Sequence, residues 1–101
     1  RAIRIMNDSG SRVELFWINP STGEGTLMSK PHIYDGATFP LNSYVGHEFE
    51  VREMPSTKTG RCKNEDQVCR IGNFKVSEND EQAIRILPGF QVVFADSLTT
   101  A

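Results

Sequence analysis

The sequence predicts an all-β sandwich of about seven strands, and three observations support this prediction. Apolar and polar residues alternate with a period of two through most of the chain, which is the spacing that places side chains on the two faces of a strand. Turn residues (Asn, Asp, Gly and Pro) separate these short segments. No window carries an apolar stripe at helical spacing. Successive strands joined by short loops are expected to pair antiparallel.

The expected strands can be placed in order along the chain. The segments 2–6 and 12–18 flank the turn residues 7–10 and predict a β-hairpin. The remaining strands are expected at 26–28, 37–41, 47–53, 70–76, 82–87 and 90–94. Residues 54–67 are polar and are expected to form a long loop. We expect one β-sandwich domain over residues 1–95, with residues 96–101 as a loose tail.

The alternation in the segment 47–53 is regular enough to assign its two faces. His47, Phe49 and Val51 form the expected inward set, and the polar residues between them face outward.

Charge and hydropathy exclude some classes of partner. The chain has 101 residues, with 11 basic and 13 acidic ones. A nucleic-acid-binding domain usually shows a basic excess, so no nucleic-acid partner is expected. No apolar run approaches the roughly 20 residues of a spanning helix, so no membrane insertion is expected. Because the chain begins at Arg1 and not at Met, we expect it to be part of a larger or processed protein.

Two cysteines, Cys62 and Cys69, lie at the mouth of one polar loop. A disulfide between them is geometrically reasonable if the loop doubles back, and two unpaired thiols are the alternative. Their spacing does not match a zinc knuckle. Asn7-Asp8-Ser9 is a glycosylation sequon in an expected turn. Together these features favour a secretory or extracellular location, with a cytoplasmic one as the alternative.

No motif in the sequence predicts an enzyme. Ser43 and His47 are close in sequence, but no nucleophile elbow accompanies them. Nearby carboxylates such as Glu48 and Glu50 are expected on one solvated strand face. No phosphate-binding loop, metal site or cofactor is expected, so the sequence favours a non-catalytic binding module.

Two segments match a known family. The first is Phe16-Trp17-Ile18-Asn19, followed by Gly23-Glu24, and the second is Asn42-Ser43-Tyr44-Val45-Gly46-His47-Glu48-Phe49. They resemble the β-domain of the von Hippel–Lindau tumour suppressor family, which carries Trp-Leu-Asn, a Gly-Glu turn and then Ser-Tyr-x-Gly-His-x-Trp. The match is good over roughly residues 1–53, and the rest of the chain shares only the order of strands.

The resemblance implies a seven-stranded sandwich that holds an extended peptide containing 4-hydroxyproline. Trp17 would form the floor beneath the proline ring, and Ser43 and His47 would hydrogen-bond the hydroxyl group. Tyr44 accompanies them in the motif, and Phe49 replaces the family's second Trp on the pocket wall. An aromatic face suits a proline ring, and fixed polar groups reject a ring that lacks the hydroxyl.

The sequence also departs from the family pattern at a second position of the implied pocket. The family has a Tyr between the Gly-Glu turn and a Pro-Gly turn, which Asp35-Gly36-Ala37-Thr38 matches loosely in this chain. Met28 falls at the position of that Tyr, and Tyr34 is an imperfect substitute. This difference puts hydroxyproline specificity in question. The family's helical adaptor-binding domain has no counterpart, so assembly of a ubiquitin ligase is not implied.

The expected function is therefore recognition of proline- or hydroxyproline-containing peptides. The alternative is a structural, adhesion or assembly sandwich stabilised by Cys62–Cys69. In that alternative Trp17, Ser43 and His47 are only core or turn residues.

Overall fold

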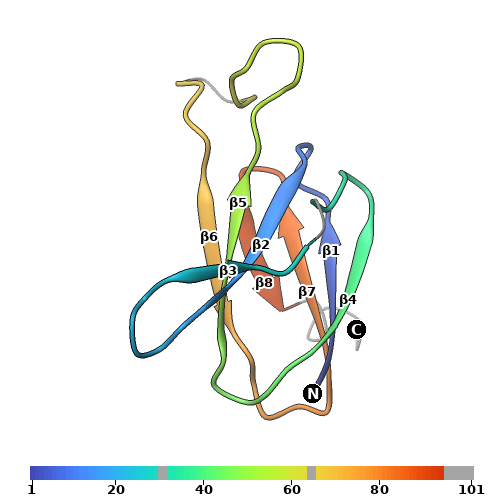
Figure 1. Ribbon diagram of the computed structural model, residues 1–101. Helices are drawn as coiled ribbons and strands as arrows, with labels where there is room; N and C mark the ends of the chain where they lie inside the picture. Colours follow the sequence, from blue (N-terminus) through green and yellow to red (C-terminus); the bar gives the residue numbers. More distant parts are fainter. Residues whose placement is uncertain (30–31, 64–65, 95–101) are drawn as a thin grey trace.

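The computed structural model describes residues 1–29, 32–63 and 66–94. These residues form eight β-strands and no helix (Figure 1). The strands are β1 (Ala2–Asn7), β2 (Val13–Ile18), β3 (Gly25–Leu27), β4 (Thr38–Asn42), β5 (Glu48–Glu53), β6 (Ile71–Lys75), β7 (Glu81–Leu87) and β8 (Gln91–Phe94). Every bound lies within one residue of the range expected from the alternation. The expected tail, residues 96–101, lies outside the described residues.

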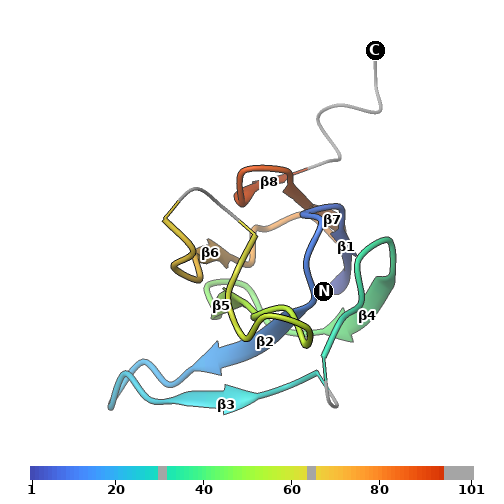
Figure 2. The ribbon, with the colours of Figure 1, turned by 90° about the horizontal axis from the view of Figure 1, so that it is seen from above.

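The strands form two four-stranded sheets that face each other (Figure 2). One sheet has the order β4-β1-β7-β8, and the other has the order β3-β2-β5-β6. An all-β, sandwich-like fold is thus confirmed. One pair of neighbours differs from the antiparallel expectation, because β1 and β7 run parallel, with Ile5 opposite Ile84. Parallel neighbours need a long crossover, and the chain between β1 and β7 includes all four strands of the second sheet.

Alternate residues of both sheets fill the space between them. The buried hydrophobic residues on the strands and the segments beside them are Ile3, Ile5, Val13, Leu15, Ile33, Phe49, Val51, Phe74, Val76, Ile84, Ile86 and Phe90. Full burial of such a side chain contributes about 1.5–3 kcal/mol to folding. The inward set expected for the segment 47–53 is confirmed for Phe49 and Val51, which are buried, whereas His47 precedes β5 and remains partly exposed.

The hairpin expected between the first two strands is wrong. β1 pairs with β4 and β7, and β2 pairs with β3 and β5. The segment between β1 and β2 therefore carries the chain from one sheet to the other. Alternation identifies a strand and its buried face, but it does not identify the strand's partner. Turn residues are equally compatible with a hairpin and with a crossing between sheets.

The side chain of Asn7 holds this crossing in place and is fully buried, at 0% exposure. Its Nδ2 donates to the carbonyl oxygens of Ser11, at 2.7 Å, and Ile33, at 3.0 Å. Its Oδ1 accepts from the backbone N–H of Ser9, at 3.1 Å, and from the Ser9 hydroxyl, at 2.7 Å. All the hydrogen-bonding capacity of the amide is in use. The side chain of Asn7 is thus inaccessible to a glycan in this fold, and the sequon gives no support for a secretory location.

Folded protein secreted from a eukaryotic host is expected to carry no glycan at Asn7. A glycan on Nδ2 would remove one of its two N–H donors, break at least one buried hydrogen bond and need space that the fully buried side chain does not have. Mass spectrometry before and after treatment with an N-glycosidase tests this expectation, and a loss of glycan mass from Asn7 in folded protein would contradict it.

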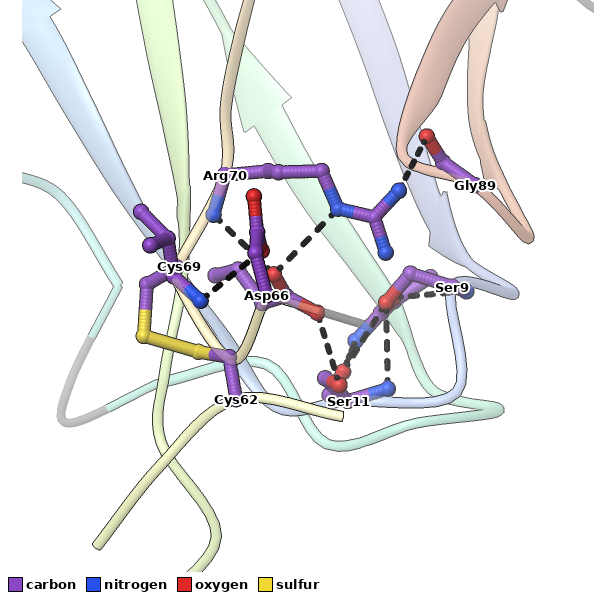
Figure 3. Close-up of polar contacts among 10 residues, drawn as sticks. Ser9, Ser11, Cys62, Asp66, Cys69, Arg70 and Gly89 are labelled. Carbon is purple, nitrogen blue, oxygen red and sulfur yellow. Dashed lines mark hydrogen bonds and ion pairs between the residues drawn. A yellow bond between two sulfur atoms is a disulfide. The ribbon is translucent and has the colours of Figure 1, made fainter. Parts of the chain in front are cut away.

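The long loop expected after β5 is confirmed, and a disulfide joins Cys62 to Cys69 within it. The disulfide lies beside a polar network at the end of β5 (Figure 3). The buried carboxylate of Glu53 accepts from the Ser11 hydroxyl, at 3.1 Å, and from the backbone N–H of Arg70, at 3.0 Å. The guanidinium of Arg70 lies 3.7 Å from Glu53 and donates to the carbonyl oxygen of Gly89. This network joins the loop to both sheets.

Replacing Gly72 with Ala is expected to destabilise the domain by about 1–3 kcal/mol. Gly72 lies on β6 opposite Val51, and a Cβ built there would be 2.5 Å from Val92 Cγ2. Equilibrium urea unfolding measures the difference. Asn73→Ala on the same strand is the control, since Asn73 is exposed. A Gly72→Ala protein as stable as this control would contradict the prediction.

Candidate functional site

The six residues that the sequence assigned to peptide binding line a single cavity of about 220 Å³. They come from β2, from the end of β3, from the connection between β4 and β5, and from β5 itself. The complete lining is Trp17, Met28, Asn42, Ser43, Tyr44, His47 and Phe49. The connection between β4 and β5, which carries Ser43, Tyr44 and His47, lies at the end of the sandwich opposite the loop that follows β5 (Figure 1).

The register of the second sheet places two aromatic residues of the cavity, Trp17 and Phe49, side by side. Trp17 on β2 is the partner of Phe49 on β5, and residues opposite each other in an antiparallel pair share one face of the sheet. Phe49 is 1% exposed and stacks on Phe74 with 5.4 Å between ring centroids. Trp17 lies next to the last residue of β2 and is only partly buried. Phe49 is thus both a core residue and the base of the cavity wall.

A tight turn positions the polar residues of the site. The backbone N–H of His47 donates to the carbonyl oxygen of Tyr44, at 3.1 Å, and Gly46 has a φ of 86°, a conformation that favours glycine. Two further hydrogen bonds dock this turn onto the end of β6, from Gly46 N to Val76 O and from Val76 N to His47 O. These bonds fix the backbone that carries Ser43, Tyr44 and His47.

Ser43 and His47 are hydrogen-bonded to each other. Ser43 Oγ lies 3.2 Å from His47 Nδ1. This bond leaves Nε2 of the ring and further bonding capacity on the hydroxyl for another partner. The pair thus presents two polar groups at fixed positions.

Aromatic rings surround the imidazole of His47. The ring centroid of Trp17 lies 5.7 Å away, and that of Tyr44 lies 5.4 Å away in an edge-to-face arrangement. Tyr44 is 75% exposed, an unusual environment for an aromatic side chain next to an apolar cavity. Trp17 Nε1 is buried and has no hydrogen-bond partner among the residues that the structure describes. The rings form an open apolar wall beside the Ser43–His47 pair.

Met28 and Tyr34 occupy very different places. Met28 lines the cavity, as its position in the sequence predicted. Tyr34 lines a different concavity, beside the disulfide loop, and therefore does not replace the missing tyrosine. Asn42 also lines the cavity, although sequence reasoning did not assign it to the site. Its position directly before Ser43 was the one available signal.

The cavity suits an uncharged ligand group. Its described lining residues include no Asp, Glu, Lys or Arg. The nearest ion pair in the neighbouring concavity, which shares Trp17 and His47, joins Lys75 to Glu48 at 3.9 Å. Among the described residues, no cluster of three or more His, Cys, Asp and Glu side chains could hold a metal ion, and no helix is long and apolar enough to cross a membrane.

A scan against protein-family models gives no match, and a search of curated proteins gives no significant match.

Trp17→Ala is expected to destabilise the domain by about 2 kcal/mol, less than the ~3–5 kcal/mol expected for Phe49→Ala. The difference arises because Trp17 is partly exposed, whereas Phe49 is buried and stacked. Urea unfolding of the two variants followed by circular dichroism makes the comparison. Equal losses would show that Trp17 is as much a core residue as Phe49.

Proposed function

We propose that this domain is a non-catalytic peptide-recognition module of the von Hippel–Lindau β-domain type, which binds an extended segment through a proline or 4-hydroxyproline ring. The convergence of Trp17, Met28, Ser43, Tyr44, His47 and Phe49 on one cavity carries the proposal. These residues come from separate segments of the chain, and the spacing of the motif in the sequence independently selects the same set.

The size of the cavity favours one side chain of a peptide over a free small molecule. Sites for small organic ligands usually measure about 300–1,000 Å³, and this cavity measures about 220 Å³. A five-membered ring can fill such a space and leave the rest of the ligand outside. Trp17 and Met28, which are both partly exposed, provide the apolar surface that the ring would contact, and the buried Phe49 supports Trp17 from the core.

The Ser43–His47 pair supports recognition of a ring hydroxyl. A hydroxyl on the ring could donate to one member of the pair and accept from the other. If the ring lacks the hydroxyl, these polar groups lose water when the ligand binds and gain no partner. Hydroxyproline is therefore expected to bind more tightly than proline.

An edge strand beside the cavity supports an extended ligand. β3 is at the edge of its sheet and leads directly into Met28. An edge strand offers backbone N–H and C=O groups to a peptide that adds as a further strand. Backbone pairing would give affinity, and the ring cavity would select the sequence.

A structural role is the second candidate, and burial favours it at two positions. Phe49 belongs to the core, and Ser43 is 8% exposed. In this reading the domain is an assembly or adhesion sandwich, and the cavity binds nothing. The disulfide fits an oxidising, extracellular compartment in either reading.

Titration with two matched peptides, one with proline and one with 4-hydroxyproline, separates the candidates. Trp17 is the only tryptophan in the chain, so its fluorescence reports directly on the cavity. We expect a saturable change with both peptides and tighter binding of the hydroxylated one. ¹⁵N chemical-shift changes should centre on Ser43, Tyr44 and His47. No response to either peptide would leave the structural role.

Ser43→Ala and His47→Ala are each expected to weaken the hydroxyproline peptide by about 1–3 kcal/mol. Both variants should keep their fold, because each removes one hydrogen bond at a partly open site. Ser21→Ala and His32→Ala are the controls, since neither residue lines the cavity. A variant that unfolds would identify its residue as structural, and unchanged affinity would exclude the hydroxyl contact.

A further inference from the structure

The basic residues of this chain fall into two groups that differ in their partners. Five of them form ion pairs with carboxylates, and these pairs are Arg1–Asp80, Arg52–Glu50, Arg70–Glu53, Lys75–Glu48 and Arg85–Asp8. Within the described residues, Arg4, Arg12, Lys58, Arg61 and Lys63 form no ion pair. All of these except Arg4 lie at the end of the sandwich that carries the disulfide loop.

Three of these four cations are held by uncharged acceptors. Arg12 donates to the carbonyl oxygen of Pro55 at 2.8 Å, and Arg61 donates to the side-chain oxygen of Gln67 at 2.9 Å. Lys63 Nζ lies 3.4 Å from the carbonyl oxygen of Gly10. Such bonds orient the side chains but do not neutralise them. The positive charges are fixed in place and remain available to an anion.

The disulfide contributes to this arrangement. Arg61 and Lys63 are the immediate neighbours of Cys62 in the chain, and Cys62 is buried and bonded to Cys69. Fixing Cys62 restricts the backbone of both cations. Because less freedom is lost on binding, a preorganised site binds more tightly than a mobile one.

The four cations surround two adjoining concavities of about 550 and 520 Å³, which share Lys58 and Lys63 in their linings. Arg12 lines the first and Arg61 the second. The first also contains Tyr34, which is 60% exposed, and Asp35, whose Oδ1 accepts from the backbone N–H of Gly10 at 3.0 Å. Ser and Thr hydroxyls complete the linings. We refer to this surface as the basic end.

We propose that the basic end binds a sulfated oligosaccharide. Lys and Arg side chains that form no ion pair among the described residues suit sulfate groups spaced along a chain, as in heparin. The hydroxyls and Asp35 suit sugar hydroxyls, and the exposed face of Tyr34 suits the apolar face of a sugar ring. The disulfide fits the oxidising compartments in which secreted proteins function.

A nucleic acid fits this surface less well. Single-stranded nucleic acids are bound by grooves in which several aromatic side chains stack on successive bases, and the described lining of the two concavities offers only Tyr34.

Isothermal titration calorimetry of the oxidised domain with a heparin oligosaccharide tests the proposal at about 150 mM NaCl. Measurable binding is expected, and its affinity should fall as salt rises. Lys58→Glu/Lys63→Glu should weaken binding by about tenfold or more. The matched control is Arg4→Glu/Lys75→Glu, which makes the same change in net charge away from the basic end. The control should bind like the original domain.

Three ligands identify the chemistry of the site. A desulfated oligosaccharide of the same length, inorganic sulfate and a single-stranded oligonucleotide of equal charge should all bind more weakly than the sulfated oligosaccharide. If both double variants lose heparin binding equally, the basic end is not the binding site. If the folded, unsubstituted domain does not bind heparin, the sulfated-oligosaccharide assignment is wrong. The assignment is also wrong if any of the three comparison ligands binds as tightly as the sulfated oligosaccharide or more tightly. Thermal unfolding of each variant verifies that it is folded.

Discussion

The buried carboxylate of Glu53 imposes a constraint on which much of the structure depends. Glu53 is 6% exposed, yet it accepts hydrogen bonds from Ser11 and Arg70. Removing a charge from water without such partners costs several kcal/mol. The crossing between β1 and β2 and the start of β6 must therefore meet at the end of β5. Arg70 extends this requirement to the β7–β8 turn through the carbonyl oxygen of Gly89. One acidic side chain and its partners thus connect both sheets at this end of the sandwich.

Strand β5 links this constraint to the two surfaces that we assign to binding. The turn at Ser43–His47 precedes the strand, and the loop with the disulfide follows it. At a rise of about 3.3 Å per residue, a strand of this length separates the two surfaces by about 20 Å. The basic end is made of loop residues, the usual position of binding residues. The cavity combines the turn at Ser43–His47 with the strand residues Trp17 and Phe49. Since the cavity is uncharged and the basic end is not, the two surfaces select different chemistry.

The alternating pattern was sufficient to predict the eight strands and the inward positions of Phe49 and Val51, because both follow from local spacing. Strand pairing was not predictable in this way. The Asn7 turn was expected to close a hairpin, but its buried amide instead bonds Ile33 from a distant segment. The cavity residues were predicted because two segments resemble a known family motif, and Met28 because it falls where that family has a tyrosine. The basic end was missed because Arg12 joins Lys58 and Lys63 only in the folded chain.

Met28 determines how far the cavity can discriminate between ligands. A tyrosine at this position would add a hydroxyl near the ring, whereas a methionine thioether is flexible and only a weak acceptor. Discrimination by a ring hydroxyl therefore depends mainly on the Ser43–His47 pair. Two hydrogen bonds of this kind, at about 0.5–1.5 kcal/mol each, correspond to a preference of roughly 5- to 150-fold for the hydroxylated ring. If the cavity binds peptides as we propose, the flexibility of Met28 would also let the wall adapt to different residues beside the ring.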